Sequence, residues 1–215
     1  MAHIPSADTR SLGDIGFERA LERALEPSPD YDVSRWLFVP NTYEEYRYLL
    51  GTVGARSLIC IGVNPSTAAP DRLDPTLKSV QRIALANGFD SFLMLNVYPQ
   101  RATAPGDMDK SCHQALHREN LKALAYALSR TEVPVVWAAW GAVIETRAYL
   151  ADCLRDMLEL SRGYDARWVR CGAISKKGHP HHPLYLRKDE PLQAFDMRGY
   201  LAMLESGRRT AEGGA

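Results

Sequence analysis

The feature that most constrains the fold is an alternation of apolar, strand-length runs with segments of helical spacing. The four runs are residues 56–63 (RSLICIGV), 91–97 (SFLMLNV), 133–141 (VPVVWAAWG) and 166–174 (ARWVRCGAI). Continuous apolar runs of this length are typical of strands that are covered on both faces. The alternation therefore predicts an α/β fold, a three-layer α/β/α arrangement around a central four-stranded parallel sheet.

The three intervals between these runs have helical spacing. In the first interval Asp74 is typical of an N-cap, Pro75 of a first helical residue, and Gly88 is placed to end the helix. The second helix is expected at about residues 110–129, and the third around residues 150–158.

The chain is expected to divide into three segments. Residues 1–30 form a polar N-terminal extension with a short helical pattern, residues 31–204 a single α/β domain that begins with N-terminal edge elements, and residues 205–215 a disordered tail. No apolar run approaches the roughly 18 residues of a membrane span, and the N-terminus lacks the pattern of a secretory signal. We therefore expect a cytoplasmic monomer that does not enter membranes.

The net charge is zero, from 26 basic and 26 acidic residues. Because domains that bind nucleic acid often carry a strong basic excess, this balance counts against such a partner. Residues 175–188 (SKKGHPHHPLYLRK) are nevertheless locally basic, with four cations, three histidines and no acidic residue. The four cysteines show no C-x-x-C spacing, so neither a disulfide framework nor an iron–sulfur site is expected.

Ligands of parallel sheets bind beyond the carboxyl ends of the strands, so three strand-end loops are expected to line one site. In the first loop Asn64 follows the strand, and Pro65 stiffens the backbone after it. An amide can hold a water or a substrate amide but cannot take a proton as a carboxylate does. The alternative role of Asn64 is an Asx turn. Ser66 and Thr67, with neighbouring backbone N–H groups, either bind a phosphate or form a structural turn.

Two further groups complete the first and second loops. Asp71 and Asp74 are candidate bases, although capping alone explains Asp74. Asn96 ends an otherwise apolar strand, and a buried amide without a partner is unfavourable. It therefore either braces a loop or faces a ligand such as a nucleobase. Arg101 and Thr103 follow in the same loop and are candidates to contact a phosphate or a base substituent.

Three histidines crowd the third loop. Their spacing does not indicate a metal site, because no H-E-x-x-H is present and no acidic or cysteine partner lies beside them. A proline follows both His179 and His182 and restricts the backbone there. This indicates that the histidine side chain is held in a fixed position, as for an acid or a hydrogen-bond donor to a leaving group. Tyr185 offers a stacking face nearby. We expect neither a metal nor another cofactor.

Several motifs in fixed order, GVNPSTA, LDPT, LMLNVYPQRAT, AAWG and HPLYL, resemble the DUF1643 family over roughly residues 35–186. The same order resembles, more distantly, the uracil-DNA glycosylase superfamily. That superfamily has a four-stranded parallel sheet, a G-x-[DN]-P motif after strand one and an H-P motif after strand four. Residues 62–65 (GVNP) are similar to the first motif in the asparagine form of its mismatch-specific branch.

The resemblance implies roles for individual residues. Asn64, between Gly62 and Pro65, positions the hydrolytic water, and Asn96 reads the edge of the base. His182, or alternatively His179, stabilises the departing base. The chain departs from the uracil-specific pattern in both motifs, since STAAPDRLDPT follows the first and HPHHPLYL replaces H-P-S-P-L-S. A different or larger base than uracil is therefore expected.

The expected function is that of a DNA glycosylase that hydrolyses the N-glycosidic bond of a modified base. The expected base is a hypermodified pyrimidine of phage DNA, which makes the enzyme a defence protein. Such a base must leave the duplex, so cations are needed on the phosphates, and Lys176, Lys177, Arg187 and Lys188 are suited to that task. Two alternatives remain open: a hydrolase or transferase of free nucleosides or nucleotides, and a nucleic-acid-binding module without turnover.

Overall fold

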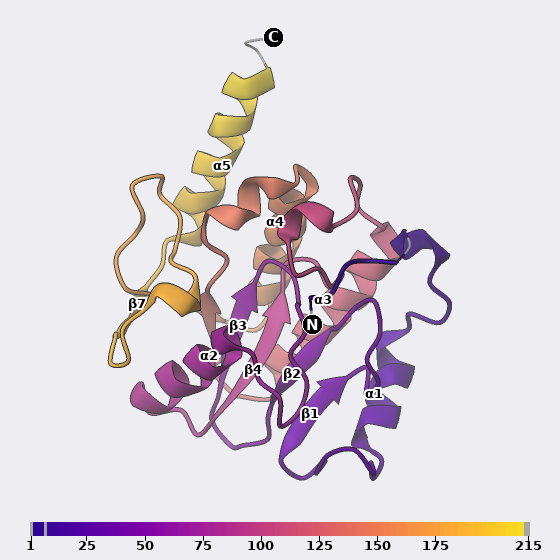
Figure 1. The fold of residues 1–215 in the computed structure, drawn as a ribbon. Helices are drawn as coiled ribbons and strands as arrows, with labels where there is room; N and C mark the ends of the chain where they lie inside the picture. Colours follow the sequence, from indigo (N-terminus) through magenta and orange to yellow (C-terminus); the bar gives the residue numbers. More distant parts are fainter. Residues whose placement is uncertain (1, 7, 213–215) are drawn as a thin grey trace.

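The computed structural model describes residues 2–6 and 8–212, and its centre is a mixed seven-stranded sheet in the order β1-β2-β4-β3-β5-β6-β7 (Figure 1). The strands are β1 Trp36–Val39, β2 Leu49–Thr52, β3 Ser57–Gly62, β4 Ser91–Asn96, β5 Val135–Ala138, β6 Arg167–Cys171 and β7 Leu192–Ala194. β3 pairs in parallel with β4 and β5, and β5 pairs in parallel with β6. The four apolar runs of the sequence therefore form a contiguous parallel centre.

The sheet is wider than the four strands that the sequence predicts. β1 and β2 add an antiparallel edge beside β4, and β7 adds another beside β6. β1 and β2 lie within the expected edge elements. β7 is only three residues long and partly exposed, so it has no apolar run that marks it in the sequence.

The helices are α1 Phe17–Leu25, α2 Pro75–Ala86, α3 Gln114–Ser129, α4 Tyr149–Arg162 and α5 Met197–Glu212. α2 begins as predicted, because the Asp74 carboxylate accepts a hydrogen bond of 2.9 Å from the Leu77 N–H. Four short 3-10 helices are η1 Thr9–Ser11, η2 Pro105–Asp107, η3 Gly141–Thr146 and η4 Pro183–Tyr185.

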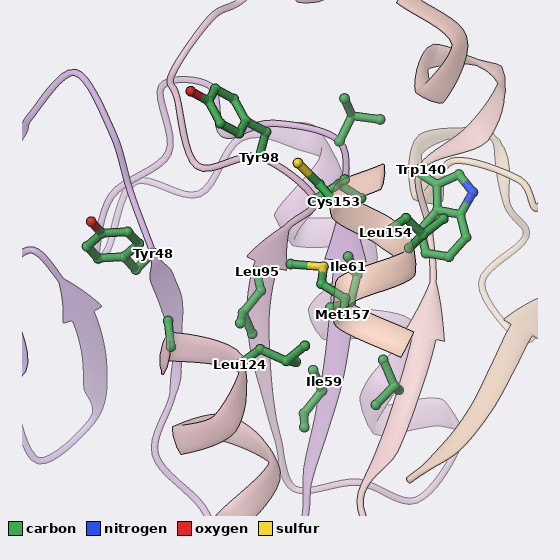
Figure 2. Packing of buried hydrophobic residues seen from close by; sticks show 14 of the residues in the cluster. Tyr48, Ile59, Ile61, Leu95, Tyr98, Leu124, Trp140, Cys153, Leu154 and Met157 are labelled. Carbon is green, nitrogen blue, oxygen red and sulfur yellow. The ribbon is translucent and has the colours of Figure 1, made fainter. Parts of the chain in front are cut away.

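Helices cover both faces of the sheet, which gives two hydrophobic cores. The larger core joins Ile59, Ile61 and Leu95 of the sheet to α1, α3, α4 and α5. Figure 2 shows the part of this core that α3 and α4 form with the sheet. The smaller core packs α2 against the other face, onto residues such as Cys60 and Trp137. The structure therefore has the three layers that the sequence predicts, and α2 is the helix that packs on the smaller-core face of the sheet. Loops that leave the carboxyl ends of β3 and β5 diverge to opposite faces, which is the arrangement that opens a binding site in such sheets.

Both terminal segments are attached to the domain. Near the N-terminus the Thr9 N–H donates to the Asp109 carboxylate over 2.9 Å, and Phe17 N–H donates to Glu119 over 2.8 Å. At the other end α5 continues beyond Glu205, where the sequence predicted a disordered tail, and projects from the body in Figure 1. Arg155 of α4 contacts the Glu205 carboxylate at 2.9 Å, which ties the helix to its neighbour.

Residues 213–215 lie outside the described residues, so disorder there stays a prediction. Within residues 2–6 and 8–212, no helix is both long enough and apolar enough to cross a membrane.

Candidate functional site

The loops at the carboxyl ends of the four parallel strands contact one another, as the topology predicts. After β3 and β4, the Asn64 amide donates to the Ala102 carbonyl over 2.7 Å, and the Ala102 N–H donates to the Pro65 carbonyl over 2.9 Å. After β5 and β6, a Cβ on Gly141 would lie 3.4 Å from the Cβ of His182. The predicted polar residues of three distant segments therefore share one edge of the sheet.

Asn64 has a fixed orientation. Its Nδ2 donates to two backbone carbonyls, that of Ala102 at 2.7 Å and that of Pro65 at 3.1 Å. Because carbonyls only accept, the amino group of the amide must face them. The amide oxygen makes no hydrogen bond to the part of the chain that the structure describes. The half-buried Asn64 thus presents an oriented acceptor, which is what a residue that holds a water needs.

Asn96 is fully buried at the end of β4, and neither its amide oxygen nor its amide nitrogen has a partner among the described residues. It lies opposite Gly62 in the β3–β4 register, and a Cβ on that glycine would be 3.1 Å from the Asn96 Oδ1. The same Cβ would lie 2.7 Å from the Cε of Met94, so the two strands pack closely beside the Asn96 amide. Asn120 of α3 holds the strand end by donating to the Asn96 carbonyl over 2.9 Å. The backbone of Asn96 is braced, whereas its side chain keeps a free donor and a free acceptor.

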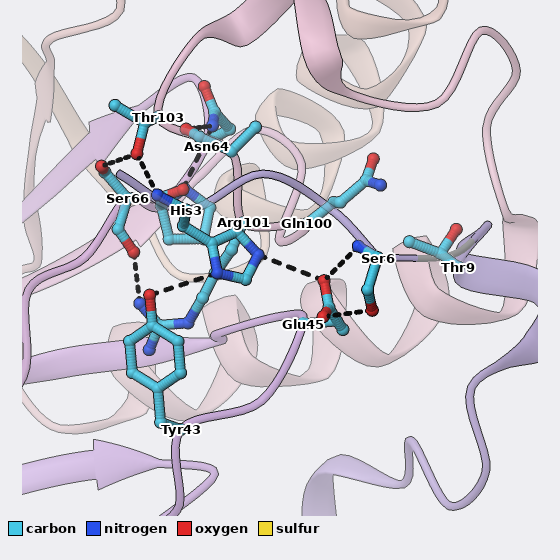
Figure 3. Close-up of polar contacts among 12 residues, drawn as sticks. His3, Ser6, Thr9, Tyr43, Glu45, Asn64, Ser66, Gln100, Arg101 and Thr103 are labelled. Atoms are coloured by element: carbon cyan, nitrogen blue, oxygen red, sulfur yellow. Dashed lines mark hydrogen bonds and ion pairs between the residues drawn. The ribbon is translucent and has the colours of Figure 1, made fainter. Parts of the chain in front are cut away.

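Arg101 lies inside the site rather than on its surface. Its side chain is fully buried, donates to the Ser66 carbonyl, and lies under the Tyr43 ring, 4.2 Å from the ring centroid (Figure 3). Arg47, which precedes β2, donates to the Ala68 carbonyl over 3.2 Å and is equally buried. Burial lowers the pKa of Arg101 to about 10 and that of Arg47 to about 9.

An N-terminal segment covers this part of the site, which the sequence did not predict. The His3 N–H donates to the Thr103 hydroxyl over 2.7 Å, and the His3 ring lies between Tyr43 and Glu45, 3.2 Å and 3.1 Å from their side-chain oxygens. Ser66 joins the network because its hydroxyl is 3.3 Å from that of Thr103 (Figure 3). These residues come from segments far apart in the chain, so no local motif marks them.

His182 is the more available of the two candidate histidines. Its Nδ1 accepts a hydrogen bond of 3.4 Å from the Leu184 N–H, so the neutral ring carries its proton on Nε2. Burial lowers the pKa of His182, and the nearby charge of Asp74 partly offsets the effect. His182 therefore remains neutral near pH 7 and offers an N–H donor. Tyr185 is exposed, with its ring centroid 6.0 Å from that of His182.

His179 is engaged within the fold. It is buried, with its Nδ1 2.9 Å from the Tyr200 hydroxyl and its Nε2 3.3 Å from a carboxylate oxygen of Glu145. Trp140 donates to the same hydroxyl over 2.8 Å, so the proton of Tyr200 is directed to His179. These contacts are those of a histidine that braces the loop.

Other predicted residues lie around the site or away from it. The Asp71 carboxylate accepts a hydrogen bond of 3.1 Å from the Trp36 indole and is 3.4 Å from Arg35, so it anchors the loop to β1 instead of facing the site. Thr67 is half-buried in the same loop. The cations of the third loop are all exposed: Lys176, Lys177, Arg187 and Lys188. Lys177 also lies 3.8 Å from Glu145.

Comparison with known proteins gives one result. The model of a protein family described as "Protein of unknown function (DUF1643)" matches residues 47–184, which include both Asn64 and His182. No curated protein and no solved structure matches the chain. Because the matched segment covers well over half of the sequence, the chain belongs to the DUF1643 family.

Proposed function

We propose that the protein is a DNA glycosylase that hydrolyses the N-glycosidic bond of a modified base and leaves an abasic site. The observation that carries this proposal is the buried amide of Asn96 at the carboxyl end of β4, whose donor and acceptor have no partner among the described residues. An unpaired buried amide is unfavourable by about 1–3 kcal/mol for each group. A flipped base that pairs with this edge removes that penalty, which gives the site both affinity and selectivity.

The neighbouring residues supply the remaining chemistry. The Asn64 amide oxygen accepts a hydrogen bond from a water and directs the water's oxygen toward C1′ of the sugar. As the bond between C1′ and the base breaks, the oxygen of the water bonds to C1′, and its proton is given up to the base. The Nε2–H of His182 donates a hydrogen bond to the base as it leaves with the bonding electron pair. The products are the free base and an abasic sugar.

The surroundings of His182 agree with a substrate of high charge. Lys176 and Lys177 precede the histidine loop, and Arg187 and Lys188 follow it, all exposed. These cations are available to phosphates on both sides of an extruded nucleotide. With a net charge of zero, the protein is expected to bind DNA with modest affinity that falls as salt rises.

The substrate is expected to differ from uracil, because the segment from Ser66 to Arg72 replaces the tyrosine–histidine ending of the uracil-specific motif. We propose that the base is a hypermodified pyrimidine of phage DNA. We also propose that the protein is a monomeric, cytoplasmic enzyme of phage defence. The four-stranded parallel centre and the position of Asn64 just beyond β3 support the distant resemblance to uracil-DNA glycosylases.

The test is to incubate the protein with single- and double-stranded oligonucleotides that contain uracil, 5-hydroxymethylcytosine, glucosylated 5-hydroxymethylcytosine or only ordinary bases. Alkaline cleavage measures abasic sites, and mass spectrometry identifies the released base. We expect cleavage of at least one modified substrate and none of the ordinary DNA. Absence of abasic sites on every substrate would rule the proposal out.

A second candidate is a hydrolase of free nucleotides, which the two buried arginines and the zero net charge favour. It predicts release of base from deoxynucleoside monophosphates, with no loss of rate when Lys176 and Lys177 are changed to glutamine. If the protein is a DNA glycosylase, it should release no base from the monophosphates, and changing Lys176 and Lys177 to glutamine should lower its rate on DNA.

A further inference from the structure

Two buried arginines converge on one backbone carbonyl beneath the loop that follows β3. Nη1 of Arg47 is 3.2 Å and Nη1 of Arg101 is 3.4 Å from the carbonyl oxygen of Ala68. Arg101 also donates to the carbonyl of Ser66. Arg47 precedes β2 and Arg101 follows β4, and because these strands pair antiparallel the two arginines lie at the same end of the pair, with exposed fractions of only 1% and 0%.

Among the described residues no carboxylate forms a direct ion pair with either arginine, and Asp74 near Arg47 and Glu44 and Glu45 near Arg101 act only from beyond ion-pair distance. Neither arginine has an Asp or Glu oxygen within the 4.0 Å of an ion pair. Nε of Arg47 and both Nε and Nη2 of Arg101 are buried without a hydrogen-bond partner among those residues. The nearby carboxylate of Glu45 is already bonded to His3 and Ser6. Burying a charge without a counter-ion costs several kcal/mol, so an arrangement of this kind calls for an anion.

The free atoms define the geometry of that anion. Nε and Nη2 lie on one edge of a guanidinium and form the fork that binds two oxygens of a carboxylate or phosphate. Arg101 has this edge unoccupied by any described residue. Tyr43 stacks on its guanidinium and is itself 49% exposed, so a single aromatic side chain separates that face of Arg101 from solvent (Figure 3).

The pair lies next to the proposed reaction site. Ala102, whose carbonyl fixes the Asn64 amide, directly follows Arg101, and Ser66 is two residues after Asn64. We propose that Arg47 and Arg101 form a buried anion site that takes a phosphate group of the substrate. In DNA this group is a phosphodiester beside the extruded nucleotide, and in a free nucleotide it is the terminal phosphate. The identification of a nucleotide rests on the proposed function, whereas the binding of phosphate does not.

The experiment measures binding by the full chain at constant ionic strength. Calorimetry and thermal unfolding are followed with inorganic phosphate, with deoxycytidine 5′-monophosphate and its nucleoside, and with an oligonucleotide that has no terminal phosphate. We expect saturable binding that Arg47→Gln and Arg101→Gln each weaken by about 10- to 100-fold, the range for a lost hydrogen bond to a charged group. Binding of the monophosphate or of the oligonucleotide tells which source supplies the phosphate.

Arg147→Gln is the matched control. Arg147 also donates to backbone carbonyls, among them those of Met108 at 2.7 Å and Asp109 at 3.0 Å, but it lies between η3 and α4. It should bind each probe like the wild type. The proposal is overturned if the wild type binds none of the probes, or if all variants bind them equally.

Conservative variants cover the case in which a glutamine variant does not fold. Arg47→Lys and Arg101→Lys keep the charge but lose the fork, so we expect binding several-fold weaker than that of the wild type, and unchanged binding contradicts the proposal. Since no step of this test requires base release, an inactive protein that binds phosphate through the two arginines would refute the glycosylase and leave the anion site standing.

Discussion

Replacing Asn96 with leucine is expected to stabilise the free protein and to abolish base recognition. The amide oxygen and nitrogen are both buried without a partner among the described residues, and each such group costs about 1–3 kcal/mol. Leucine has the same branched shape and no polar atom, so it removes both unpaired groups. After allowance for imperfect packing, we expect the free energy of unfolding to rise by about 1–3 kcal/mol.

Urea unfolding measures this change, and thermal unfolding should show a rise of roughly 2–4 °C for each kcal/mol. The matched control is Asn120→Leu, since Asn120 is also fully buried and its amide oxygen also has no partner among the described residues, but its Nδ2 donates to the carbonyls of Asn96 and Val97 at 2.9 and 3.3 Å. That variant leaves two carbonyls unpaired and should lose about 1–3 kcal/mol. If Asn96→Leu instead destabilises the protein as much as Asn120→Leu, the amide of Asn96 is a structural group and the reasoning fails.

Four further predictions concern the loops around His182. The free energy of unfolding should decline below about pH 6.5, because the lowered pKa of His182 lets the unfolded chain take up a proton before the folded protein does. His182→Gln should make this decline shallower. Urea midpoints between pH 5 and 7 that fall equally in both proteins would contradict this. Asp74→Ala should lower the free energy of unfolding by about 1 kcal/mol through loss of the α2 cap. Asp74→Asn should keep the cap and lower the pKa of His182 further, and an NMR titration without such a shift would count against the coupling. Gly141→Ala should destabilise by about 1–2 kcal/mol in urea unfolding, because φ is +60° and the new Cβ meets His182 at 3.4 Å, and a stability equal to wild type would refute the strain.

The centre of the fold was predictable because its signals are local. β3 and β4 are apolar runs buried along their whole length, β5 is buried except at its first residue, β6 is only partly buried, and the Asp74–Pro75 pair marks the start of α2. β7 has no such signal, since its three residues are strand only through pairing with β6. α5 did carry a signal, because Met197, Tyr200, Leu201 and Leu204 are buried at helical spacing.

The site was predictable only in part. Topology brings the ends of parallel strands together, so the contacts among the loops of Asn64, Asn96 and His182 follow from the strand order. Arg47 and His3 reach the site from the start of β2 and from the N-terminus, which no spacing along the chain reveals. The sequence also cannot tell that the histidine at position 179 faces inward, because this depends on its contacts with Tyr200 and Glu145.

The central claim is that Asn64 holds the water that attacks the sugar. The most direct measurement is the single-turnover rate of base release from the best modified oligonucleotide, by wild-type protein and by Asn64→Ala, with DNA binding measured in parallel. Asn64→Ala should release the base at a rate at least about 100-fold lower with binding nearly unchanged, as for the loss of a group that acts on the reacting atoms. An Asn64→Ala protein that releases the base at the wild-type rate would contradict it.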